Sequence, residues 1–196
     1  LIKRIRRKYP DLILENCASG AMRADNGTLR LFDLQSTSDQ EDYRAYPSIA
    51  TGSYAYLLPE KAGIWAYPYP LEHKYLQSDI PEEDLLSMQD GRQTVFNMVT
   101  GLSGTLYLSG RIDLADEYNF SLIKEGAALY KETREFKSRA YPVFFHEHKK
   151  MSDDSFILYG LRDENFSEMY LYVWLFNEKK IKTKIGKYEN CKLIYP

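Results

Sequence analysis

The chain has 196 residues, of which 44% are hydrophobic and 28% are charged, and its formal net charge is −2. This balance argues against a nucleic-acid partner and against a membrane surface, since both favour a concentrated basic face, and no apolar run approaches the roughly 20 residues that cross a bilayer. The 17 Tyr, 9 Phe and 2 Trp fit either a sugar-binding surface or a Tyr-rich β-sandwich core.

Short apolar runs alternate with longer helical stretches from the first residue to about residue 136. Residues 1–10 have the pattern of the last turns of an amphipathic helix. The expected strands are 12–18, 34–37, 62–67 and 104–108. The expected helices are 46–57, 85–98 and 115–136, the last with apolar positions at Phe120, Ile123, Ala127, Tyr130 and Phe136. This alternation predicts half of a (β/α)8 TIM barrel over residues 1–138.

The character of the chain changes after this point. The expected strands are 141–146, 156–161, 169–176 and 191–195, with turns at 163–165 and 177–180. We therefore expect residues 139–196 to form part of an antiparallel β-sandwich. A half barrel leaves strand edges and one sheet face bare, so the chain is expected to need its missing half or a partner for stability. Both ends look like cuts through folded protein, which predicts a fragment.

The two cysteines, Cys17 and Cys191, do not have the spacing of a metal site. Two free thiols are typical of a reducing compartment, which favours the cytoplasm. His146 and His148 flank Glu147 in a charged run and are expected to lie on a solvated edge, and His73 has no evident partner. No metal site is therefore predicted.

Two polar segments follow the first two expected strands. The first is E-N-C-A-S-G-A-M-R-A-D, from Glu15 to Asp25, and the second is Q-S-T-S-D-Q-E-D, from Gln35 to Asp42. Strands that end in small and polar residues are typical of the rim of an α/β barrel, where the carboxyl ends of the strands line the active site.

Asp39 is the candidate of most interest in the second segment, with Glu41 and Asp42 close behind it. Carboxylates this close repel one another, which favours a protonated carboxyl that can act as a general acid. The alternative is structural: Ser38 or Asp39 is the N-cap of a helix, and the acidic residues that follow interact favourably with its dipole. The residues alone favour the cap.

These two motifs resemble those of the α-galactosidases of glycoside hydrolase family 36, the melibiase type. Residues 17–23 match its C-x-S-G-x-x-R motif, and residues 37–42 correspond to its S-D-N-T-D motif, with Gln40 and Glu41 where the family has Asn and Thr. The resemblance covers nearly the whole chain, including residues 95–110. It implies the second half of the catalytic barrel over residues 1–138, followed by a truncated C-terminal β-sandwich over residues 139–196.

The resemblance also implies roles for individual residues. Asp39 would be the general acid/base, Cys17 and Gly20 would lie against galactose hydroxyls, and Arg23 would be a fork-shaped donor. The family usually has glycines where this chain has Ala21 and Met22, which adds bulk near the sugar. The family's nucleophilic aspartate lies in a K-x-D motif on the preceding strand, and none precedes Leu12. The chain would then supply the acid/base without the nucleophile and be inactive alone.

Trp65 and Tyr67 alternate on the third expected strand and so point to the same side. If that side is the barrel mouth, Trp65 lines the sugar pocket; if it is the barrel interior, both are packing residues. The resemblance favours the pocket for Trp65.

The implied activity is retaining hydrolysis of terminal α-linked galactose from oligosaccharides, without a cofactor, by a full-length protein expected to form homo-oligomers. Two alternatives stay open. One is a relative that acts on α-N-acetylgalactosaminides or builds raffinose-type sugars. The other is a non-catalytic carbohydrate-binding or interaction module, in which Asp39 has no role in function.

Overall fold

Four of the expected strands pair in parallel. The structure, a computed structural model, describes residues 1–68, 90–145, 156–176, 182 and 191–195. The strand order β1-β2-β3-β4 follows the sequence. The strands are β1 (Glu15–Asn16), β2 (Leu34–Ser36), β3 (Ala62–Ala66) and β4 (Thr105–Leu108). Because sequential parallel strands need crossovers, the segments between them run back along the sheet.

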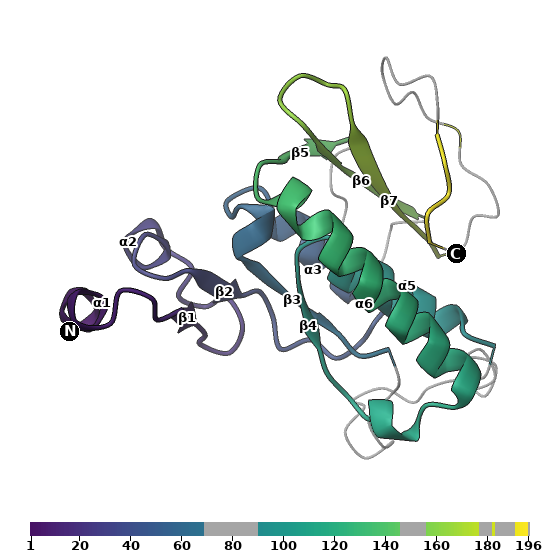
Figure 1. The fold of residues 1–196 in the computed structure, drawn as a ribbon, viewed down its shortest axis with the longest axis horizontal. Coiled ribbons are helices and arrows are strands. Elements are labelled where there is room, and N and C mark those ends of the chain that lie inside the picture. The colour runs from purple at the N-terminus through teal and green to yellow at the C-terminus, as the bar shows by residue number, and fades with distance from the viewer. Residues whose placement is uncertain (69–89, 146–155, 177–181, 183–190, 196) are drawn as a thin grey trace.

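Three helices, α3 (Tyr46–Ser53), α5 (Arg92–Leu102) and α6 (Glu117–Lys137), pack with this sheet. Figure 1 shows α5 and α6 lying side by side along β3 and β4. They cover the face that carries Ile64 and Ala66, both fully buried. Gly101 allows the close approach, since a Cβ there would lie 2.3 Å from Leu106 Cδ1. The shorter elements are α1 (Ile2–Lys8), α2 (Asn26–Leu29), η1 (Pro59–Lys61) and η3 (Ile112–Leu114).

A second sheet is antiparallel and packs against the helices. Its order is β5-β6-β7, formed by β5 (Tyr141–Phe144), β6 (Phe156–Arg162) and β7 (Met169–Leu175). The expected turn between β6 and β7 is confirmed, and Asp163 Oδ1 accepts the backbone N–H groups of Ser167 and Glu168. The indole N–H of Trp174 on β7 donates to Thr100 Oγ1 on α5 at 3.0 Å. One hydrophobic core therefore joins both sheets.

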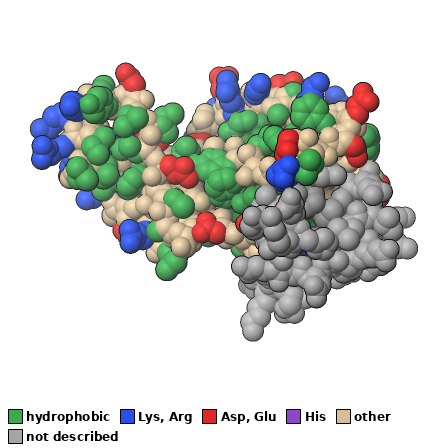
Figure 2. All heavy atoms as spheres, turned by 90° about the horizontal axis from the view of Figure 1, so that it is seen from below, with side chains coloured by type: hydrophobic (Ala, Val, Ile, Leu, Met, Phe, Trp, Pro, Cys, Tyr) green, Lys and Arg blue, Asp and Glu red, His purple; other side chains and the backbone are tan. Residues whose placement is uncertain are grey.

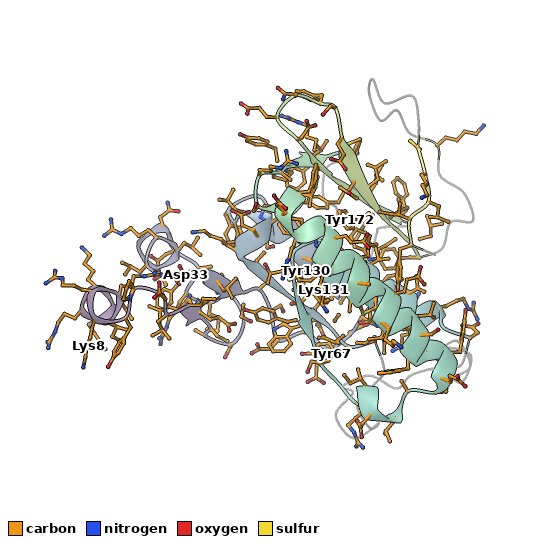
Figure 3. All side chains as sticks on the ribbon, in the orientation of Figure 1. Lys8, Asp33, Tyr67, Tyr130, Lys131 and Tyr172 are labelled. Atoms are coloured by element: carbon orange, nitrogen blue, oxygen red, sulfur yellow. The ribbon has the colours of Figure 1, made fainter. Side chains whose placement is uncertain are left out.

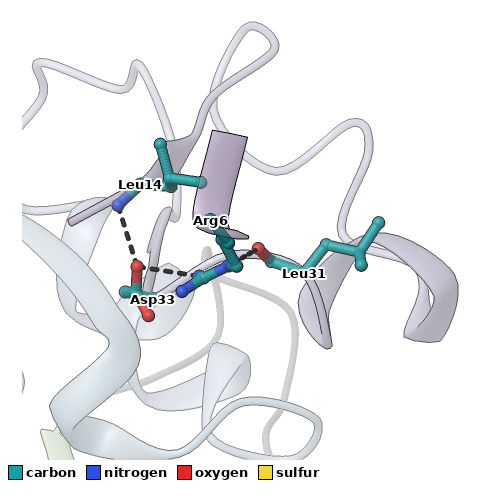
Figure 4. A network of polar contacts seen from close by, with 4 residues as sticks. All are labelled: Arg6, Leu14, Leu31 and Asp33. Atoms are coloured by element: carbon teal, nitrogen blue, oxygen red, sulfur yellow. Dashed lines mark hydrogen bonds and ion pairs between the residues drawn. The ribbon is translucent and has the colours of Figure 1, made fainter. Parts of the chain in front are cut away.

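The N-terminal helix α1 is attached by a small polar network (Figure 4). The Arg6 guanidinium donates to Asp33 Oδ2 at 2.8 Å and to the Leu31 carbonyl at 3.0 Å. The same carboxylate oxygen accepts the backbone N–H of Leu14 at 2.8 Å, and this hydrogen bond, followed by the arginine, holds the pKa of Asp33 below its usual value. The network positions the start of β1. The other basic side chains of α1 gather at this end of the molecule (Figure 2).

Three details of the expected pattern are wrong. The helix expected over 85–98 begins at Arg92, because Gly91 has a φ of +82° and interrupts a helical path; residues 85–89 lie outside the described part. Phe120 is exposed, and Asn119 is buried in its place, held by Asp116. Residues 191–195 form no strand, and the Tyr195 hydroxyl instead donates to the carbonyl of Leu122 on α6.

The fold class is thus a parallel four-stranded sheet with helices, followed by an antiparallel three-stranded sheet. Helix α6 ends at Lys137 and β5 begins at Tyr141. Division into domains at 138/139 stays a prediction, because a shared core does not separate two units.

Candidate active site

The loops that follow β1 and β2 are in direct backbone contact. Gly20, in the loop after β1, has a φ of +74°, and a Cβ built on it would lie 2.5 Å from Ser38 Cα and 3.1 Å from Asp39 N. Only a glycine fits here, because it must both adopt the left-handed conformation and leave room for the neighbouring backbone. The two sequence motifs therefore meet at the carboxyl ends of adjacent parallel strands.

Buried amides hold the first loop in place. Asn16 Nδ2 donates to Gln35 Oε1 at 2.6 Å and to the Arg23 carbonyl at 3.2 Å. Gln35 Nε2 donates to the Ser36 carbonyl at 2.7 Å and to the Gly20 carbonyl at 3.4 Å. Asn16 and Gln35 are register partners on β1 and β2, so the pairing of the strands sets the position of the loop.

This loop tolerates the two residues that replace the family's glycines. Among the described non-glycine residues of the loop only Ser19 has a positive φ, of 46°. Ala21 and Met22 follow with negative φ values, which any L-residue adopts. The Met22 side chain is 81% exposed, so its bulk lies in solvent in this structure.

The Asp39 carboxylate is exposed just beyond the end of β2. A series of turns follows it, in which Ser38 Oγ accepts the Gln40 N–H at 3.1 Å and Asp42 Oδ1 accepts the Arg44 N–H at 2.9 Å. The helix-cap alternative is wrong, because α3 starts only at Tyr46, its N-cap is Ala45, and no side chain caps it. Within the described residues no hydrogen bond or ion pair holds the Asp39 carboxylate.

Trp65 lies on the sheet face opposite the helices, in register with Tyr107 of β4. Its ring stacks on Tyr67, with centroids 6.1 Å apart, and meets the edge of Tyr107 at 5.1 Å. Its indole N–H donates to Ser36 Oγ, which is fully buried, at 3.2 Å. Trp65 and Tyr67 therefore share a side, as predicted, and Trp65 keeps part of its surface exposed.

The tyrosines around the strand ends are neutral hydrogen-bonding groups at neutral pH. Burial raises the pKa of Tyr67 to about 12, with smaller contributions from Tyr46 and from the carboxylates of Glu41 and Asp39. Burial likewise raises the pKa of Tyr46 and, together with the charge of Glu15, that of Tyr107. Figure 3 shows Tyr67 where β3 ends. The site thus combines the carboxylates of Asp39 and Glu41 with aromatic and hydroxyl groups, an arrangement suited to a polyol with an apolar face.

The structure brings some predicted residues together and leaves others apart. Gly20 and Asp39 are adjacent, whereas the side chains of Cys17 and Arg23 are exposed. Cys17 is near enough to Tyr107 to contribute to its raised pKa. His73, His146 and His148 lie outside the described residues. Sequence reasoning missed Gln35 and Tyr46, whose hydroxyl contacts Thr37 Oγ1 at 2.9 Å. The signal available for Gln35 was a glutamine inside a strand that was expected to be buried.

A cavity of about 630 Å³ lies elsewhere, between α5, α6, β7 and residues 192–195. Its walls are mainly apolar, and no predicted site residue lines it; Trp174 and Tyr195 are among the residues that do. It is an interlayer space rather than part of the strand-end site. Among the described residues no three His, Cys, Asp or Glu side chains cluster as metal ligands, and none of the helices there is long and apolar enough to span a membrane.

No protein-family model matches the sequence, and comparison with curated proteins gives no match. Solved structures do match. The galactosidase domain of the α-galactosidase–sucrose kinase AgaSK has a TM-score of 0.72 and 18% identity, over 97% of this chain and 24% of that chain. An AgaA variant from Geobacillus stearothermophilus, a family 36 α-galactosidase in complex with raffinose, has a TM-score of 0.64 and 17% identity, over 87% of this chain and 21% of that chain. AgaB from the same organism has a TM-score of 0.64 and 16% identity, over the same shares.

These matches confirm the predicted resemblance at the level of the fold. The chain has the fold of part of the family 36 α-galactosidases, and it spans about a quarter of the length of those proteins.

Proposed function

We propose that this chain is part of a retaining α-galactosidase of family 36 and carries its general acid/base, Asp39. The observation that supports this most strongly is the backbone contact between Gly20 and Ser38. It joins the two motifs that carry the resemblance, at the strand ends where barrel enzymes hold their catalytic residues. Four parallel strands with helices would then be half of a TIM barrel, and the antiparallel sheet would be part of a β-sandwich.

In this proposal the reaction is a double displacement at C1 of a terminal α-galactosyl unit. A nucleophilic carboxylate that we assign to no residue of this chain attacks C1, while Asp39 donates a proton to the departing glycosidic oxygen. The Asp39 carboxylate then takes a proton from water, which attacks C1 and releases galactose. Each proton that Asp39 gives in the first step is recovered in the second, so the enzyme ends unchanged. Exposure of Asp39 suits both exchanges.

The remaining site residues would bind the sugar. Trp65 offers an aromatic face for the apolar side of galactose, Cys17 and Gly20 lie where its hydroxyls would approach, and Arg23 can hold two oxygens with its guanidinium fork. The relatives' complexes with raffinose and stachyose support an α-galactosyl oligosaccharide as the substrate. Homo-oligomer formation by the full-length protein stays part of the proposal.

The test uses the full-length protein that contains this chain. Aryl α-galactoside, β-galactoside and α-N-acetylgalactosaminide are each supplied, and proton NMR identifies the first anomer released. The proposal predicts preferred hydrolysis of the α-galactoside with α-galactose appearing first. Release of the β-anomer first would contradict the retaining mechanism. Preference for the α-N-acetylgalactosaminide would favour the alternative specificity, and binding without hydrolysis would favour a non-catalytic module.

A further inference from the structure

The hydroxyl of Tyr46 connects the ends of the two neighbouring strands β2 and β3. Tyr46 begins α3, and only 2% of it is exposed. Its Oη lies 2.9 Å from Thr37 Oγ1 at the end of β2 and accepts the backbone N–H of Trp65 on β3 at 3.2 Å. It also lies within 3.4 Å of the carbonyl of Ser38, the residue before Asp39.

The hydroxyl protons and the distances together assign the direction of these hydrogen bonds. Thr37 has one hydroxyl proton, and it donates that proton to the Gly63 carbonyl at 2.8 Å. Thr37 Oγ1, at 2.9 Å, is a nearer acceptor for the Tyr46 phenol than the Ser38 carbonyl, at 3.4 Å, so we assign the donor role to Tyr46, with Ser38 as a longer second acceptor. The result is a chain from the Trp65 N–H through Tyr46 and Thr37 to Gly63. Each bond in such a chain polarises the next, so the whole chain is stiffer than its separate parts.

We propose that Tyr46 is a positioning residue that sets the place of the Asp39 carboxyl relative to the sugar bound beside Trp65. This inference rests on the proposed function. Asp39 itself has no hydrogen bond to any described residue, so its position depends on the backbone of Ser38 and on what holds that backbone. Gly20 lies against the Ser38 backbone, and the Tyr46 hydroxyl contacts the Ser38 carbonyl. Because the same hydroxyl accepts the backbone N–H of Trp65, it fixes the position of Asp39 relative to Trp65.

A matched pair of variants separates positioning from simple core stability. Tyr46→Phe removes the hydroxyl, and Tyr54→Phe removes another buried one, from the residue directly after α3, whose Oη pairs with Ser103 Oγ at 2.8 Å away from the site. In the full-length protein, kcat/KM is measured for an alkyl α-galactoside, whose leaving oxygen needs a proton, and for a dinitrophenyl α-galactoside, whose leaving group does not. Thermal unfolding is followed for both variants, and Asp39→Asn is the reference for lost acid catalysis.

If the Asp39 carboxyl is misplaced, only departure of a leaving group that needs a proton becomes slower. We expect Tyr46→Phe to lower kcat/KM for the alkyl substrate by roughly tenfold or more while the dinitrophenyl substrate changes by less than about threefold. Tyr54→Phe should leave the ratio of the two substrates unchanged. An equal loss on both substrates, or the same ratio as in Tyr54→Phe, overturns the inference. If Asp39→Asn itself shows no dependence on the leaving group, the proposed function fails instead.

A second variant keeps the test decisive if Tyr46→Phe does not fold. Thr37→Val removes the hydroxyl that accepts the phenol's proton, so the Tyr46 Oη loses its main acceptor beside Ser38. It should show the same selective loss on the alkyl substrate. A Thr37→Val protein that folds and keeps the wild-type ratio of kcat/KM for the two substrates overturns the inference.

Discussion

Gly20 and Ser38 approach so closely that a single added carbon on Gly20 would lie 2.5 Å from Ser38 Cα. This contact joins the loop after β1 to the residue that precedes Asp39. Seventeen residues of chain separate the two in sequence, and the parallel pairing of β1 with β2 brings them together. The position of Asp39 therefore depends on a residue in another motif.

Gly20→Ala tests this dependence. The new Cβ would have to displace backbone, and alanine in the left-handed conformation costs about 1–2 kcal/mol before any overlap is counted. We expect a lower unfolding temperature together with a large loss of α-galactosidase activity in the full-length protein.

Gly52→Ala is the matched control for that variant. Gly52 lies inside α3, and a Cβ there meets nothing within 4 Å. Alanine at this position should leave activity unchanged and stabilise the protein by about 0.5–1 kcal/mol, because glycine is unfavourable inside a helix. A Gly20→Ala protein as active and as stable as Gly52→Ala would contradict the structural role of the contact.

Ser36→Ala tests whether the orientation of Trp65 matters for sugar binding. It removes the acceptor of the Trp65 indole N–H, and loss of such a buried bond costs about 1 kcal/mol or more. If Trp65 supports the sugar, the KM for an aryl α-galactoside should rise several-fold, with kcat changing less.

The second tryptophan supplies the control. Thr100→Val removes the acceptor of the Trp174 indole N–H, in the core between α5 and β7. It should lower stability by a similar amount and leave KM unchanged. Equal changes of KM in both variants would mean that Ser36 acts only through global stability.

Lys137 makes stability depend on pH. Its Nζ donates to the Gly104 carbonyl at 3.2 Å and lies 4.4 Å from the centroid of the Tyr130 ring. Burial lowers its pKa from the ordinary 10.5 to about 7. Between these two values the unfolded chain binds more protons than the folded one, so stability rises with pH there, and below about pH 7 the cost of burying the charge is constant.

Lys137→Met removes this titration. The stability of wild type relative to the variant should increase from about pH 7 to about pH 9.5, by up to about 1.4 kcal/mol per pH unit. Urea unfolding of the full-length protein at the two pH values measures the difference, since other titrating groups contribute equally to both proteins. A difference that is the same at both pH values would show that Lys137 is charged in the folded protein.

Local patterns predicted most of the elements, because apolar runs and turn residues act over a few positions. The strands at 34–37 and 62–67 and the helix from Tyr46 lie close to where they were expected. Local patterns failed where a single backbone conformation or a contact distant in sequence determines whether an element forms. Gly91 interrupts a helical pattern by its positive φ. Residues 191–195 alternate like a strand, but they pair with no described strand, and Tyr195 contacts α6 instead.

The candidate site was predictable in part for the same reason. The motifs pointed to Asp39 and Gly20 as candidates, but their contact depends on the register of β1 and β2, which no local pattern specifies. Nothing in the helical pattern around Tyr46 indicates a role for its hydroxyl. That hydroxyl contacts the ends of β2 and β3, which come together only in the folded sheet.

The most direct test of the account is Asp39→Asn in the full-length protein, assayed on p-nitrophenyl and dinitrophenyl α-galactosides with and without azide. If Asp39 is the acid/base, the first step should stay near normal with the better leaving group, and azide should restore turnover by attacking the galactosyl-enzyme without needing a base. Unchanged activity on both substrates would contradict the account, because Asp39 would then have no part in the chemistry.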